Sequence, residues 1–283
     1  MGCILGRHDS FVYPTWHSDP LSWSSPLDSR RGPLPLSPSP QRGEGERHTR
    51  RRAPSPEGRG GQGVRTTRAR RDGFTRKVLA WYARAGRDLP WRRTRDPYRV
   101  LVSEFMLQQT QVSRVQEYYP RFLARFPDLD ALASARPRAV REAWDGLGYY
   151  ARASNLHALA RVVSRDSDGT LPAEPEELIK LPGIGPYTAG AVASFAYEKP
   201  VPAVDTNVAR VLRRVFFGKR ETRNGKREVW QLAAVLVPRN GKRAWKFNQA
   251  IMELGALICV ARKPKCPGCP VRPVCRTGQS PVS

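Results

Sequence analysis

The chain has 283 residues, which is enough for one or two domains, and a formal net charge of +24 with a pI near 10.8. This excess of basic residues predicts a polyanionic partner, most simply nucleic acid, because we find no apolar run able to span a bilayer and no signal-peptide core. Five cysteines, four of them crowded near the end, do not form a secreted disulfide framework, so we expect a cytoplasmic protein without membrane attachment.

Residues 1–72 are rich in Pro, Ser, Gly and Arg and lack helical periodicity, so we expect a disordered low-complexity extension. This segment contributes only +6 to the net charge, because acidic residues accompany its arginines, and +18 remains on residues 73–283. The basic character therefore belongs to the folded part. We interpret the extension as dispensable rather than as a DNA-binding arm.

A helix is predicted over residues 74–85, where apolar side chains recur on one face. Prolines then interrupt a basic segment, residues 87–99, which has Trp91 among its arginines. This segment could contact phosphates or a stacked base. The alternative is a solvated loop whose tryptophan lies in the core.

Residues 100–126 predict a helical stretch with an apolar stripe, which Glu104 interrupts. Burial would raise the pKa of an unpaired carboxyl group until it held a proton near neutrality, so Glu104 is a candidate general acid. The alternative is a helix-capping pair of Ser103 and Glu104. The run QQTQ, residues 108–111, supplies uncharged hydrogen-bonding groups where a helix could enter a duplex.

The stretch 131–163 predicts two helices joined at Gly146–Gly148, with Tyr149 and Tyr150 at the joint. Exposed aromatic side chains beside a glycine-containing loop can wedge into a base stack. The alternative is core packing, which we favour for Tyr150.

Gly183 and Gly185 lie between two prolines in LPGIGPYTAG, which predicts a tight hairpin between two helices. Such a hairpin leaves backbone N–H groups at the start of the second helix free to bind a phosphate. Asp205 then stands before a basic helix, Val208 to Val215. The pattern indicates a functional site, or an αα-turn followed by an N-capping aspartate.

Two amphipathic helices are predicted within residues 227–260, followed by Cys259, Cys266, Cys269 and Cys275. Four thiolates this close suit a metal centre, and a zinc ribbon is the alternative, although it usually shows two CxxC pairs where this chain has one. The loop between the first two cysteines would present three basic residues to phosphate: Arg262, Lys263 and Lys265.

The strings SEFMLQQTQV, GLGYYARASNLH and LPGIGPYTAGAV resemble the catalytic domain of MutY-type adenine DNA glycosylases, within the helix-hairpin-helix superfamily of endonuclease III. The resemblance covers about residues 73–276. It implies an all-α, two-lobed fold with a six-helix barrel over residues 96–202. The second lobe would combine residues 73–95 and 203–283 around a [4Fe–4S] cluster, whose cysteine spacing in these families matches that of Cys259, Cys266, Cys269 and Cys275.

For catalysis, the resemblance implies that Glu104 protonates adenine at N7 and that Asp205 stabilises the oxocarbenium-like sugar electrostatically or covalently, with Tyr187 assisting. Bifunctional relatives carry a lysine nucleophile in the helix after the hairpin. This chain has Tyr187 and no lysine in GPYTAG, so we expect a monofunctional enzyme. Asp205 lies in VDTN rather than in the VDGN or LDGN of many MutY proteins, a departure that keeps the carboxylate.

For DNA, the resemblance implies a wedge around the base opposite the flipped adenine, formed by Gln109, Leu147 and Tyr149. It places four further residues at the adenine pocket: Arg87, Trp91, Arg92 and Gln249. The partner would be double-stranded DNA containing a mismatch, bound by a monomer that is associated with the nucleoid.

MutY enzymes normally continue into a Nudix-like domain that helps to recognise 8-oxoguanine, and the sequence at hand lacks that resemblance. The sequence therefore does not determine which base lies opposite the adenine. Two other interpretations are a thymine or uracil mismatch glycosylase of the same fold, and a non-catalytic iron–sulfur DNA-binding protein. The presence of both Glu104 and Asp205 argues against the last.

Overall fold

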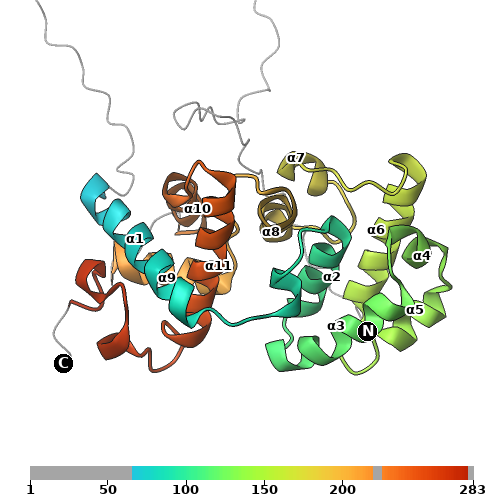
Figure 1. Cartoon of the computed structure of the whole chain (residues 1–283), viewed down its shortest axis with the longest axis horizontal. Coiled ribbons are helices and arrows are strands. Elements are labelled where there is room, and N and C mark those ends of the chain that lie inside the picture. Colours follow the sequence, from blue (N-terminus) through green and yellow to red (C-terminus); the bar gives the residue numbers. More distant parts are fainter. Residues whose placement is uncertain (1–65, 219–224, 280–283) are drawn as a thin grey trace, which may run out of the picture. The chain divides into compact units, whose positions relative to one another are not determined.

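The computed structural model describes residues 66–218 and 225–279, in which every regular element is helical (Figure 1). Most of the predicted extension, residues 1–65, lies outside the described part. Its predicted boundary at residue 72 is wrong, because the first helix begins at Arg68. The Thr67 side chain caps this helix by accepting a hydrogen bond from the Arg70 amide at 3.3 Å. None of the described helices is long and apolar enough to cross a membrane.

The helices follow one another in this order: α1 Arg68–Ala85, α2 Pro97–Leu107, α3 Val112–Arg125, α4 Leu129–Ser134, α5 Pro137–Ala143, α6 Ala151–Asp166, α7 Pro175–Leu178, α8 Pro186–Tyr197, α9 Thr206–Leu212, α10 Gly225–Leu236 and α11 Gly241–Leu257. Shorter turns are Pro90–Arg92, Cys266–Gly268 and Arg272–Val274, which are 3₁₀-helical, and Arg213–Phe217, which is π-helical and continues α9.

Prolines and capping side chains determine where several helices begin. Proline stands in the first turn of α2, α5, α7 and α8, where its missing N–H would have had no helical partner. The stretch 131–163, predicted as two helices, contains three, because Pro137 starts α5 after α4 has ended at Ser134. The predicted joint at Gly146–Gly148 does precede α6.

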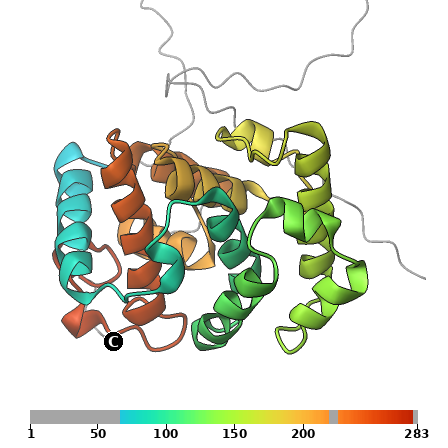
Figure 2. The same cartoon turned by 45° about the vertical axis from the view of Figure 1, so that its right-hand side comes forward.

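Two hydrophobic cores form within this part of the chain. The larger draws on α2 to α8 and runs from Leu89 to Ala203, and the smaller combines Phe74 and Val78 of α1 with residues between Val204 and Cys275. Leu89 and Trp91, which the predicted boundary at residue 95 assigned to the smaller lobe, pack in the larger core. In the smaller core, α1 packs against α11, which is distant in sequence, as both views show (Figures 1 and 2).

Candidate active site and cysteine cluster

An open cleft of ≈ 1340 Å³ is lined by residues of both hydrophobic cores. It is large enough for a nucleotide. Eight of the residues singled out from the sequence line it: Arg87, Trp91, Arg92, Glu104, Gln109, Tyr187, Asp205 and Gln249. They come from three α-helices, one 3₁₀ turn and three loops, so only folding brings them together.

Glu104 lies in the middle of α2 and is 4% exposed. The Tyr187 hydroxyl donates a hydrogen bond to its Oε2 at 2.6 Å. Burial raises the pKa of Glu104 to about 7, although the Tyr187 hydrogen bond acts in the opposite direction. The alternative of a capping pair with Ser103 is wrong, because α2 begins at Pro97 and Asp96 caps it.

Tyr187 occupies the first turn of α8, directly after the hairpin. Burial and the nearby carboxyl group of Glu104 raise the pKa of its phenol well above the ordinary value. Tyr187 therefore stays protonated and remains a hydrogen-bond donor to Glu104 across the physiological range of pH.

Asp205 matches both interpretations of the sequence, because it caps a helix and also lines the cleft. Its Oδ1 accepts from the Val208 amide at 2.6 Å and its Oδ2 from the Asn207 side-chain amide at 2.8 Å. Burial raises the pKa of Asp205, and these hydrogen bonds partly counter that effect by favouring the ionised form. Asn207 and Arg210 extend the network to the Cys259 carbonyl, which Arg210 Nε contacts at 2.8 Å.

Glu253 of α11 is a charged residue of the cleft that we did not single out from the sequence. Its fully buried carboxylate accepts from Arg87 Nε at 2.6 Å and from Arg92 Nη2 at 2.8 Å. Burial opposes ionisation, but the two arginines outweigh it and lower the pKa of Glu253 to about 2. The sequence signal that could have identified Glu253 is an acidic residue inside the otherwise apolar turn IMELG. Glu253 thus holds two cations in place at the wall of the cleft.

We expect Glu253→Ala to destabilise the protein by about 3–5 kcal/mol, because it leaves Arg87 and Arg92 without their buried counter-charge. Urea unfolding followed by circular dichroism measures this loss. The matched control is Glu142→Ala, which removes an exposed carboxylate from Arg138 and Arg125 and should cost far less, because solvent screens exposed ion pairs. Equal losses for the two variants would contradict the prediction.

Trp91 and Gln249 are both buried, at 6% and 5% exposure, although both line the cleft. The Trp91 ring packs edge-on against Tyr119, with ring centroids 5.6 Å apart. The alternative of a core tryptophan therefore describes this residue better than an exposed stacking platform.

The residues expected to form a DNA wedge lie in two neighbouring loops. Gln109, in the loop between α2 and α3, is exposed. Tyr149, before α6, is 62% exposed and is one of the most exposed large apolar side chains described. Leu147 is only 6% exposed and packs in the larger core. Neither Leu147 nor Tyr149 lines the cleft.

The hairpin between α7 and α8 depends on glycine at one position. Gly183 has a φ of +75°, and a Cβ there would lie 2.7 Å from Asn155 Cβ, so a larger residue cannot fit without movement. Gly185 is the residue before α8 and has open space around it. The hairpin lies outside the cleft lining, as do three exposed residues of the cysteine loop: Arg262, Lys263 and Lys265.

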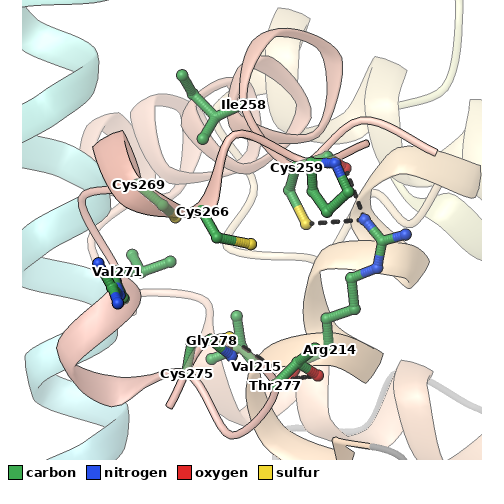
Figure 3. Close-up of a pocket in the computed structure, with 12 residues that line it drawn as sticks. Arg214, Val215, Ile258, Cys259, Cys266, Cys269, Val271, Cys275, Thr277 and Gly278 are labelled. Carbon is green, nitrogen blue, oxygen red and sulfur yellow. Dashed lines mark hydrogen bonds between the residues drawn. The ribbon is translucent and has the colours of Figure 1, made fainter. Parts of the chain in front are cut away.

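The four cysteines near the C-terminal end line a single cavity, with Arg214 beside Cys259 (Figure 3). None of them forms a disulfide. Burial, together with the nearby thiols of the other three cysteines, raises the pKa of Cys269 to about 11. Among residues 66–218 and 225–279, no three His, Cys, Asp or Glu side chains are placed to hold a single metal ion.

Comparison with known proteins identifies the family. Residues 102–239 match the family described as HhH-GPD superfamily base excision DNA repair protein. The structure of a thermostable thymine-DNA glycosylase is 34% identical with a TM-score of 0.68, and the match covers 97% of that chain and 74% of this one. The chain belongs to the HhH-GPD superfamily of base excision DNA repair proteins. The helical fold and the family predicted from the sequence are thus confirmed.

Within the HhH-GPD superfamily, the chain is similar to several adenine DNA glycosylases. That of Mycolicibacterium smegmatis is 46% identical over 196 residues, covering 69% of this chain and 66% of the relative. That of Rattus norvegicus is 45% identical over 217 residues, covering 73% of this chain and 42% of the relative. A trapped endonuclease III–DNA complex is 25% identical with a TM-score of 0.65, covering 75% of this chain and 97% of that one. The chain thus spans less than two thirds of the length of these adenine glycosylases.

Proposed function

We propose that this protein hydrolyses the N-glycosidic bond of adenine in duplex DNA where adenine is mispaired with 8-oxoguanine or guanine. The observation that carries the proposal is a buried carboxyl group with a pKa of about 7, Glu104, in the same cleft as a second carboxyl group, Asp205. A pair of carboxyl groups, one acting as a general acid, is the usual means of cleaving a glycosidic bond. The adenine glycosylases similar to this chain support adenine as the base.

In this mechanism Glu104 acts as the general acid. It is 4% exposed and holds its proton up to about pH 7. When the C1′–N9 bond breaks, the bonding electron pair goes to adenine, and the proton from Glu104 at N7 neutralises the departing base. Water then adds to the cationic C1′ of the sugar and gives its proton to the Glu104 carboxylate, which restores the acid.

Asp205 supplies the negative charge that stabilises the cationic sugar. Its two hydrogen bonds hold the carboxylate at the start of α9, so the charge is positioned before the substrate arrives. Tyr187 orients Glu104 through its hydrogen bond. No lysine stands at the position of Tyr187, and we propose that strand breaks appear only after alkali treatment.

The flipped adenine would lie against Trp91, Gln249 and the arginines that Glu253 holds. Glu253 neutralises one of the two positive charges and fixes both guanidiniums, so the pocket can offer oriented N–H donors to a base. We propose that these donors contact the flipped base.

We propose that the four cysteines hold a [4Fe–4S] cluster. Such a cluster takes one thiolate for each iron, and four free cysteines line one cavity here. A zinc ribbon usually shows two CxxC pairs, whereas this chain has one. When bound, a four-thiolate cluster has no open position for hydrolysis, so its role would be structural. Iron and acid-labile sulfide analysis of protein purified without oxygen tests this, and a zinc content of one per chain would contradict it.

We expect adenine release to slow above pH 7 as Glu104 loses its proton. Tyr187→Phe removes a hydrogen bond that lowers the pKa of Glu104, so this pKa rises and the decline starts at higher pH. The readout is the midpoint of the single-turnover rate between pH 5 and 9, which is independent of any overall loss of rate. A midpoint that stays constant or moves to lower pH would contradict the proposed contact.

The experiment that tests the function is single-turnover base release from four duplexes, with A opposite 8-oxoguanine, A opposite G, T opposite G and U opposite G. Adenine release, with strand breaks only after alkali, is the expected result. Thymine or uracil release alone would assign the protein to the mismatch branch, to which the 34% identical thymine-DNA glycosylase belongs by its name. No release from any duplex, by protein with a complete cluster, would favour a binding protein.

A further inference from the structure

A buried arginine joins the two loops that carry Gln109 and Tyr149. Arg152, in the first turn of α6, is 7% exposed. Its guanidinium donates only to backbone carbonyls, and these lie in the last turn of α2 and in the two loops. On the α2 side they are Phe105 O at 3.0 Å, Met106 O at 2.7 Å and Gln108 O at 2.5 Å; on the α6 side they are Leu147 O at 3.1 Å, Gly148 O at 2.9 Å and Tyr149 O at 3.4 Å.

This charge is buried without a carboxylate partner. No Asp or Glu of the described residues lies within ion-pair distance of Arg152, and burial lowers the pKa of its guanidinium. The carbonyls of Phe105 and Met106 belong to the last turn of α2, where no helical N–H can reach them, so Arg152 also caps that helix. Because burying a charge is costly, the carbonyls of both loops are needed to hold it.

Both loops also hold a strained residue at their tip. Gln109 has a φ of +57° and Tyr149 a φ of +49°, a left-handed conformation that residues other than glycine adopt rarely. Arg152 binds the carbonyl directly before Gln109 and the carbonyl of Tyr149 itself. Since both tip side chains are exposed, core packing of these side chains does not hold the strained conformations.

The guanidinium also lies close to two aromatic rings. Its central carbon is 5.4 Å from the centroid of Trp144, which is fully buried, and 5.6 Å from the centroid of Tyr149, which is 62% exposed. Arg152 thus connects the exposed ring of Tyr149 to the core of the larger lobe through cation–π contacts.

We propose that Arg152 is a positioning residue that couples Gln109 and Tyr149 into one two-pronged wedge. The two side chains then enter the duplex together when adenine leaves the stack. This inference rests on the proposed function. If the loops were independent, each would have to be ordered separately on DNA, and base flipping would be less probable for the same contacts.

Two variants separate the geometry of Arg152 from its charge. Arg152→Lys keeps the positive charge but loses the planar fork that reaches both loops, and Arg152→Met loses both. We expect each to slow single-turnover adenine release by about 10–100-fold. The control Arg165→Met removes an exposed arginine of the same helix, paired with Asp166, and should stay within about twofold of wild type. Restoration of the wild-type rate by lysine would show that charge alone matters and would overturn the proposal.

A double-mutant cycle distinguishes positioning from general support of the fold. The same Arg152→Lys change is made in a Gln109→Ala, Tyr149→Ala background, where no wedge remains to be positioned. We expect its effect there to shrink to about twofold or less, because coupled residues are not additive. An equal loss in both backgrounds would overturn the proposal, since it would show that Arg152 supports only the fold.

A spectroscopic readout keeps this test separate from the chemistry. 2-Aminopurine replaces the adenine opposite 8-oxoguanine, and the cycle is repeated in Glu104→Gln protein, which cannot release the base. We expect Arg152→Lys to reduce the fluorescence rise on binding when the wedge is present. In the Gln109→Ala, Tyr149→Ala background, we expect the same change to leave the fluorescence rise unaltered. A fluorescence rise in wild type without base release from any duplex would overturn the proposed reaction alone. Wild-type fluorescence from Arg152→Lys would overturn the positioning role alone.

Discussion

We expect replacement of Glu104 by glutamine to abolish adenine release while DNA affinity stays within about threefold of wild type. Glutamine has nearly the same shape but no acidic proton, so the departing base keeps its negative charge, and loss of a general acid costs about 10²–10⁴-fold in rate. The measurement is single-turnover release from a duplex with A opposite 8-oxoguanine, together with a binding titration. Retained release would remove Glu104 from the mechanism.

A stability measurement on the same variant shows that the protein still folds. The pKa of Glu104 is raised from 4.5 to about 7 in the folded state, so the stabilisation from its bound proton is complete below pH 4.5 and is lost as the pH rises through 7. Glutamine does not ionise. The Tm of Glu104→Gln relative to wild type should therefore increase between pH 5 and pH 8. A constant difference would mean that the carboxyl group is not buried in solution.

We expect replacement of Asp205 by asparagine to lower the rate of adenine release by about 10²–10³-fold without unfolding α9. Asparagine caps a helix as well as aspartate does, so the hydrogen bond from the Val208 amide can persist while the charge is lost. The negative charge of Asp205 also raises the pKa of Glu104, so the pH midpoint of any residual activity should move to a lower value. The variant therefore separates the capping role from the catalytic one.

The matched control is Asp128→Asn, which changes the capping residue of α4 in the same way. Its Oδ1 accepts from the Ala131 amide at 2.8 Å, and Asp128 does not line the cleft. We expect its rate to match wild type. Equal activity of the Asp205→Asn and Asp128→Asn proteins would reduce Asp205 to a helix cap.

Several features could be predicted from short stretches of sequence because their causes are local. Proline and glycine around the hairpin determine where α7 ends and α8 begins. Glu104 stands in an apolar run with helical periodicity, which predicts its burial and therefore its raised pKa. The four cysteines lie within a short segment, so their spacing alone indicates a common site.

Other features could not be predicted, because their partners are distant in sequence. Glu253 pairs with Arg87 from 166 residues away, and Arg152 binds carbonyls up to 47 residues away. A charged residue on an amphipathic helix has the same pattern whether it faces water or a buried partner. Whether Trp91 is exposed or packed in the core could not be predicted for the same reason, because its packing depends on Tyr119 of another helix.

The sequence by itself determined the helical fold, the family and most of the residues that carry the proposed chemistry, because periodicity, turns and motif spacing are properties of neighbouring residues. Only the tertiary structure decided what those residues face. The pKa of Glu104 depends on burial and on Tyr187 from another helix, and the two exposed loops depend on Arg152. Desolvation and hydrogen bonding act through space, so the ionisation of a carboxyl group and the conformation of a loop are set by whichever elements pack around them.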